Sequence, residues 1–174
     1  MAVSNTYQAI ATTTLGSNAT TVTFSSISSA YTDLVFIIRC NWTTTGNAPV
    51  ILTFNNDSTS NYSYVRLFGN GSTATSDEIT SNTPNGMDIG YMPGTDGTAP
   101  GTIIFNIMNY SNTTTYKTSL DRWESNASVS GKQYVAAEAG LWRSTAAINR
   151  IDLVFPSSAF ATGSTFTLYG IKAA

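Results

Sequence analysis

Hydrophobic and polar residues alternate along most of the chain, in short runs separated by turn-forming residues. In the run STFTLYGI at 164–171, Phe166 and Leu168 alternate with threonine and tyrosine. A period of two residues is typical of a β-strand that buries one face. The same pattern predicts ten or eleven strands, at 7–14, 20–25, 33–41, 50–54, 62–68, 87–92, 102–108, 116–124, 133–142, 150–155 and 164–171.

The segments between these runs are predicted to be turns and loops. A Gly-Ser-Asn turn signal at 16–18 predicts that the first two strands pair as a hairpin. The polar stretch at 69–86 is predicted to be irregular surface, and the helix candidate is a turn at 144–147. No linker or composition break interrupts the chain, which predicts one domain over residues 1–174. We therefore expect an all-β fold, a single jelly-roll-like antiparallel β-sandwich of about ten strands.

The strand predicted at 33–41 is the most apolar of the set. Val35 and Ile37 share one of its faces, and the larger apolar side chains share the other. Because both faces are apolar, this strand is expected to be central in its sheet or covered on its outer face by a neighbouring chain. Val35 and Ile37 are therefore candidates for a subunit interface.

Composition narrows the classes of function. Ser, Thr and Asn account for 64 of the 174 residues, which suits turns and strand exteriors. Hydrophobic residues make up 41% and aromatic residues 11%, too many for a disordered chain. The net charge is −2 and the eight lysines and arginines are scattered, so we expect no nucleic-acid partner. No apolar run reaches membrane-spanning length, so no membrane partner is expected. The lone Cys40 is predicted to be a small buried hydrophobe and suits a reducing compartment.

Candidate catalytic residues are few. The sequence lacks histidine and has one cysteine, which excludes Ser-His-Asp and Cys-His nucleophile systems and cysteine-cluster metal sites. No GxxxxGK[ST] phosphate loop is present, and we expect no cofactor and no metal. A pair of carboxylates could still hydrolyse a glycoside. The candidates are Asp77 with Glu78, Asp121 with Glu124, and Glu138. We expect these acids to be exposed or salt-bridged, Asp121 for example with Arg122 or Arg143, so the chain is predicted not to be an enzyme.

Several aromatic residues lie at strand ends or in polar surroundings. Tyr62 and Tyr64 share one face of their strand, whereas Val65 and Leu67 share the other. Exposed aromatic rings can stack on sugars or anchor a protein interface, and packing at the edge of the core is the alternative for most of them. Trp42, Tyr62 and Tyr64 are the candidates for glycan or partner contact, with the two tyrosines as an exposed pair.

Five segments are informative when taken together. They are TTTLGSNATTVTFSSI (12–27), YTDLVFIIR (31–39), NYSYVRLFGNGS (61–72), AGLWRSTAAINRIDLVF (139–155) and FATGSTFTLYGI (160–171). In this order the set resembles a family of small β-sandwich virion proteins and domains of tailed bacteriophages, many of them from cyanobacterial and other aquatic hosts. The resemblance spans nearly the whole chain and implies a fold and a class, not site residues.

The resemblance implies a capsid decoration or cement protein, a head fibre, or part of a tail fibre, and a homo-oligomer that is commonly a trimer. The sequence shows no heptad-patterned shaft, which favours a compact knob that binds the phage major capsid protein. We therefore expect a non-enzymatic capsid decoration protein that stabilises the head surface and is assembled into virions in the cytoplasm of the host bacterium. The alternative is a tail- or head-fibre module that recognises a host surface glycan.

Overall fold

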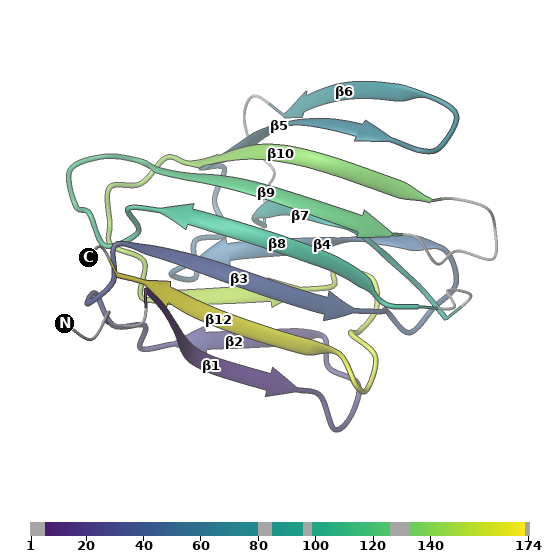
Figure 1. Ribbon diagram of the computed structural model, residues 1–174, viewed down its shortest axis with the longest axis horizontal. Coiled ribbons are helices and arrows are strands. Elements are labelled where there is room, and N and C mark those ends of the chain that lie inside the picture. The colour runs from purple at the N-terminus through teal and green to yellow at the C-terminus, as the bar shows by residue number, and fades with distance from the viewer. Residues whose placement is uncertain (1–5, 80–84, 96–98, 126–132, 173–174) are drawn as a thin grey trace.

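The computed structural model describes residues 6–79, 85–95, 99–125 and 133–172. Over these residues the chain forms twelve β-strands and no helix (Figure 1). The strands are β1 (Tyr7–Thr14), β2 (Thr21–Ser25), β3 (Asp33–Cys40), β4 (Asn47–Phe54), β5 (Tyr62–Gly69), β6 (Ala74–Ile79), β7 (Met87–Pro93), β8 (Gly101–Met108), β9 (Lys117–Ser125), β10 (Tyr134–Trp142), β11 (Arg150–Val154) and β12 (Thr165–Ile171).

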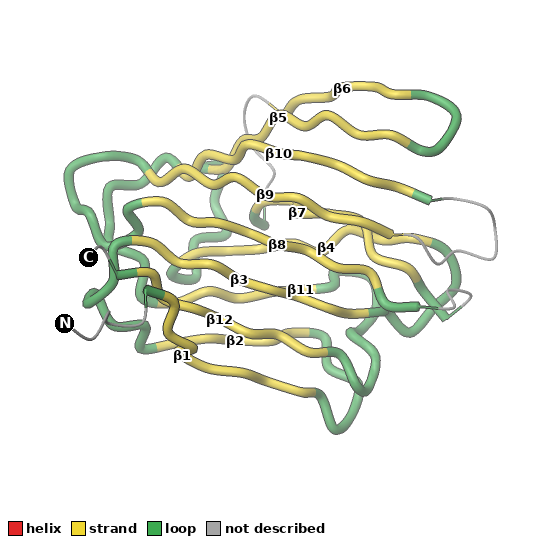
Figure 2. The backbone as a smooth tube through the Cα atoms, viewed as in Figure 1, coloured by secondary structure: helices red, strands yellow, loops and turns green. Residues whose placement is uncertain are grey.

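The described strands form two antiparallel sheets. The larger sheet has the order β1-β12-β3-β8-β9-β10-β5-β6, and the smaller sheet has the order β2-β11-β4-β7. Figure 1 views the larger sheet from its outer side, with β1 at the bottom, β6 at the top and the smaller sheet behind. Figure 2 shows that the loops gather at the two ends of this sandwich. The described part of the chain contains no helix long and apolar enough to cross a membrane.

The core lies between the two sheets and is built from one phase of each strand. In β3, Leu34, Phe36 and Ile38 are fully buried, and in β2 the inward residues are Val22 and Phe24. The rings of Phe24 and Phe36 meet edge to face across the sheets, with centroids 4.9 Å apart. Burial of each such side chain contributes about 1.5–3 kcal/mol, so this packing is the main force that holds the sheets together.

Strand β7 of the smaller sheet packs across β5, β8, β9 and β10 of the larger sheet. A glycine makes this close approach possible. A Cβ atom at Gly90 would lie 2.7 Å from Cγ of Trp123, and the φ of Gly90 is +139°. Larger residues are excluded there both by the missing space and by the backbone conformation. β7 therefore lies directly over the polar residues of β5, β9 and β10.

The predicted β-sandwich is confirmed, and all eleven predicted strands are present within three residues of their predicted bounds. Strand β6 was not predicted, because its sequence ATSDEI has no apolar phase. The predicted hairpin of the first two strands is wrong: β1 pairs with β12, and β2 pairs with β11 in the other sheet. The segment 144–147 is not helical. The jelly-roll connectivity and the single domain over 1–174 stay predictions.

Candidate functional site

The outer face of the larger sheet carries aliphatic side chains that are open to solvent. The exposed fraction is 65% for Leu67, 63% for Val135, 56% for Leu120 and 49% for Val65. These residues lie on the three adjacent strands β5, β10 and β9. A contiguous group of exposed large aliphatic residues on a sheet face is unusual for a monomeric protein, which makes this face a candidate interaction surface.

Strand register joins these residues into one groove. Ala139 of β10 lies between Val65 on β5 and Leu120 on β9. Ala137, two residues away, lies between Leu67 and Arg122 in the same way. The small alanine side chains form the floor and their larger neighbours form the walls of a hollow of about 750 Å³.

A second hollow of about 690 Å³ adjoins the first between Leu67 and Val135. We call the whole surface, with the walls Val65, Leu67, Leu120 and Val135 and the floor Ala137 and Ala139, the outer groove.

The two residues predicted for a subunit interface lie on the same outer face, farther along the sheet. Ile37 is 38% exposed, whereas Val35 is 6% exposed. Val35 is flanked in register by Tyr169 of β12 and Asn106 of β8. Ile37 therefore extends the accessible apolar surface, and Val35 is covered within its own chain.

The expectation that Tyr62 and Tyr64 form an exposed pair is wrong. Both side chains are buried, with exposed fractions of 0% and 7%, because they share the inward phase of β5. The Tyr62 hydroxyl donates to the carbonyl of Asp57 at 2.9 Å and accepts from the backbone N–H of Phe54 at 2.9 Å. Neither ring is available for stacking on a glycan.

Trp42, the third aromatic candidate, is half-buried. Its ring stacks on Phe155 with centroids 5.7 Å apart, and its Nε1 donates to the carbonyl of Gly46 at 2.7 Å. Both interactions fix this side chain within its own chain.

The inner face of the larger sheet carries a row of ionisable side chains. In register across four strands lie Asp121 on β9, Glu138 on β10, Arg66 on β5 and Asp77 on β6. Asp88 reaches the row from β7 in the smaller sheet. Asp121, Glu138, Arg66 and Asp88 are each at most 8% exposed, and Asp77 at the sheet edge is 45% exposed.

Arg66 connects the row to the opposite sheet. Its Nε and Nη2 donate to the two carboxylate oxygens of Asp77 at 2.7 and 3.0 Å, and its Nη1 donates to Asp88 at 3.2 Å. The guanidinium carbon lies 5.0 Å from the ring centroid of Tyr64 and 5.2 Å from that of Tyr91. A planar cation suits this arrangement, because it can bind a carboxylate in a bidentate manner while its faces stack on aromatic rings.

Asp121 and Glu138 face each other with no hydrogen-bond partner among the described residues. Burial, together with the nearby charge of Asp88, raises the pKa of Asp121. Burial, together with the charges of Asp121 and Asp88, raises the pKa of Glu138. Two buried carboxyl groups that face each other across paired strands do not both ionise at neutral pH, so the pair retains at least one proton.

The carboxylate pairs considered for glycoside hydrolysis are separated by the strand alternation. Asp77 and Glu78 are adjacent residues of β6, and their side chains point to opposite faces. Asp121 and Glu124 also fall on opposite faces of β9, because they are three residues apart. Asp121 and Glu138 do converge, but the solvent-accessible area of each carboxylate oxygen is below 1 Å².

The expectation that the candidate acids are exposed or salt-bridged is wrong for Asp121 and Glu138, whose carboxylate oxygens are buried without a hydrogen-bond partner among the described residues. Arg122, one of the two arginines considered for Asp121, is exposed on the outer face. Among the described residues, no three acids or cysteines are grouped in a way that could hold a metal ion.

The row of charges was missed by sequence reasoning, although a signal was present. Arg66, Asp121 and Glu138 each share a strand face with aromatic residues such as Tyr64, Trp123 and Trp142, which indicate burial. Taken strand by strand, a charged side chain predicts that its strand face is turned toward water.

Comparison of the chain with protein-family models, curated proteins and solved structures finds no match.

Proposed function

We propose that this chain is a non-enzymatic bacteriophage virion protein that assembles with copies of itself through the outer groove and decorates the capsid surface. The observation that carries the proposal is the exposure of Leu67, Val135, Leu120 and Val65 side by side on one sheet face. The resemblance of the sequence to small β-sandwich virion proteins supplies the biological setting.

The groove has the composition of a protein interface. Its walls and floor are mostly aliphatic, Arg122 forms part of one wall beside Ala137, and Glu78 and Glu124 lie next to Val65 and Val135. An apolar centre with a polar rim is typical of stable interfaces. Full burial of a valine or leucine side chain contributes about 1.5–3 kcal/mol, so four such residues provide a substantial driving force for association.

The occupant that fits the groove is a second copy of the chain. The same surface offers projecting side chains, such as Leu67 and Leu120, and a hollow above Ala137 and Ala139. A rotation axis can place the projections of one copy in the hollow of the next, and closed rings or dimers are the usual result. We expect a trimer, in line with the resemblance.

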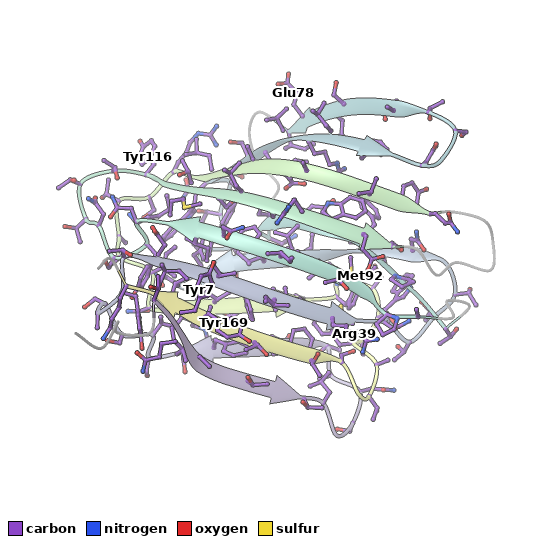
Figure 3. All side chains as sticks on the ribbon, viewed as in Figure 1. Tyr7, Arg39, Glu78, Met92, Tyr116 and Tyr169 are labelled. Carbon is purple, nitrogen blue, oxygen red and sulfur yellow. The ribbon has the colours of Figure 1, made fainter. Side chains whose placement is uncertain are left out.

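The mass of the protein in solution tests the self-association. We expect wild-type protein to run as an oligomer in size-exclusion chromatography with light scattering. Leu67→Glu places a charge in the centre of the interface and is expected to yield a monomer with an unchanged far-UV circular dichroism spectrum. Tyr116→Glu is the matched control, since Tyr116 is 54% exposed in the loop before β9 (Figure 3). A wild-type protein that is monomeric at micromolar concentration would refute the proposal.

The position in the virion is tested separately. We expect immunogold label against this chain to spread over the phage head, and purified protein to co-sediment with capsids formed by the major capsid protein. The enclosed position of Asp121 and Glu138 supports a non-enzymatic role, because no substrate reaches these carboxyl groups in this conformation. Gold confined to the tail tip would overturn the decoration role and favour the fibre module that binds a host glycan.

A further inference from the structure

A small cavity lies beside the row of charges, on the inner side of the larger sheet. It has a volume of about 210 Å³ and is lined by Arg66, Phe68, Asp77, Tyr91, Trp123 and Tyr134. These residues come from β5, β6, β7, β9 and β10, so both sheets contribute to the lining. The outer groove is on the opposite side of the sheet, because Val65 and Leu67 belong to the other phase of β5.

Aromatic rings form one continuous wall of this cavity. The rings of Tyr91 and Trp123 have centroids 5.9 Å apart, and those of Trp123 and Tyr134 have centroids 6.4 Å apart. Tyr91 and Tyr134 are half-buried, whereas Trp123 is buried beneath them. Such a surface packs against the flat apolar face of another ring.

Polar groups form the rest of the lining, and their charges are already balanced. Arg66 binds Asp77 through two hydrogen bonds and Asp88 through a third. A free anion would have to compete with two carboxylates for this guanidinium. A free cation would have to compete with the guanidinium, which already lies over the rings of Phe68 and Tyr91. The electrostatics therefore favour a neutral ligand.

Hydrogen-bonding capacity remains for such a ligand. Asp77 is 45% exposed, and each carboxylate oxygen can accept more than one hydrogen bond. The indole Nε1–H of Trp123 has no acceptor among the described residues, although it is buried. The accessible area of this nitrogen is below 1 Å², so a ligand does not reach it, and Trp123 contributes its ring to the aromatic wall.

We propose that this cavity binds a single neutral sugar ring, such as the terminal hexose of a glycan. A pyranose offers apolar C–H faces for Tyr91 and Tyr134 and hydroxyl groups for the exposed carboxylate of Asp77. The volume lies below the range of about 300–1,000 Å³ that is typical of drug-sized ligands, so one ring fits and an oligosaccharide would extend into solvent. This inference does not depend on the proposed virion role.

Saturation-transfer difference NMR on the full chain tests the proposal. The probes are the methyl glycosides of glucose, galactose and mannose at millimolar concentration, with inorganic phosphate and tetramethylammonium as charged competitors. We expect saturation transfer to the ring protons of at least one methyl glycoside, and no displacement by either ion. Absence of transfer to all three glycosides, or displacement by phosphate or tetramethylammonium, would overturn the proposal.

Matched variants locate the binding. Tyr134→Ala and Asp77→Asn are each expected to weaken glycoside binding about tenfold, the loss of one ring contact or one charge-assisted hydrogen bond. Tyr116→Ala removes a more exposed tyrosine at the other end of β9 and is expected to leave binding unchanged (Figure 3). Circular dichroism verifies that each variant is folded. Equal affinity of wild type, Tyr134→Ala and Asp77→Asn would place the sugar elsewhere and refute the assignment.

Discussion

Glu138→Gln tests whether the buried acid pair makes the stability of this protein depend on pH. Glu138 is 3% exposed and lies directly across from Asp121, which is also 3% exposed. Burial, together with the charges of Asp121 and Asp88, raises the pKa of Glu138 well above its ordinary value, and burial with the charge of Asp88 raises that of Asp121. Glutamine has nearly the same shape as protonated glutamate but does not titrate.

The sign follows from the direction of these pKa shifts. The reference pKa values are 4.5 for Glu138 and 3.8 for Asp121, so above these values the folded state binds more protons than the unfolded state. The contribution of this pair to the free energy of unfolding is therefore fully present below about pH 4 and is lost as the pH rises above the reference pKa values. At pH 7, about 2.5 pH units above the reference pKa of glutamate, the cost of keeping Glu138 protonated is about 3 kcal/mol.

Urea unfolding at pH 5, 6, 7 and 8, monitored by tryptophan fluorescence, measures this effect. We expect the free energy of unfolding of the wild type to fall steadily over this range. At pH 7 the free energy of unfolding of Glu138→Gln should exceed that of the wild type by about 1–3 kcal/mol, and at pH 5 the difference should be small. Part of the slope should remain in Glu138→Gln, because Asp121 still titrates. Glu78→Gln is the control, since Glu78 is exposed at the sheet edge (Figure 3). A flat wild-type profile, or an equal effect of Glu138→Gln at every pH, would refute the reasoning.

Two further substitutions test the packing and the hydrogen bonds around this core. Gly90→Ala is expected to lower the free energy of unfolding by about 2–4 kcal/mol, because the new Cβ would lie 2.7 Å from Trp123 at a φ of +139°. Gly163→Ala is the control and should cost about 1 kcal/mol, because Gly163 has a φ of +86° but no atom within 4 Å of the new Cβ. Equal losses of stability in urea unfolding would contradict this account. Trp142→Phe removes the hydrogen bond from Nε1 to the Asp57 carboxylate at 2.7 Å and should cost about 1.5–3 kcal/mol at pH 7. Burial raises the pKa of Asp57, but hydrogen bonds from Asn61, Thr59 and Trp142 outweigh it and lower the pKa to about 2. The stabilisation from the hydrogen bond between Trp142 and ionised Asp57 should therefore disappear as the pH falls from about 4 to 2. A pH-independent difference between Trp142→Phe and wild type in acid unfolding would argue against that role of Asp57.

The strands were predictable because each carries its own periodic signal. In β12, Phe166 and Leu168 alternate with polar residues, and burial follows this alternation. Strand β6 had no such signal, because an edge strand exposed on both faces needs no apolar phase. The partners of β1 and β2 were not predictable, since short-range turn signals cannot tell a hairpin from a crossing between sheets.

The candidate site was less predictable than the fold. Val65 and Leu67 were placed correctly on the face opposite Tyr62 and Tyr64, but the tyrosine face was expected to be the exposed one. The tyrosine face is inside because it shares its phase with Arg66, whose partners Asp77 and Asp88 enclose it. The aliphatic face is consequently turned to solvent, where it forms the outer groove.

Sequence periodicity by itself determined that the protein is all-β, where its strands lie, and which side chains share a face. Only the tertiary structure decided which face is buried. The phase that contains Arg66, Asp121 and Glu138 carries charged residues among aromatic ones, and it is stable inside because residues from other strands pair with the arginine, while burial keeps a proton on the acid pair. Those partners are distant in sequence, so alternation within one strand carries no information about them.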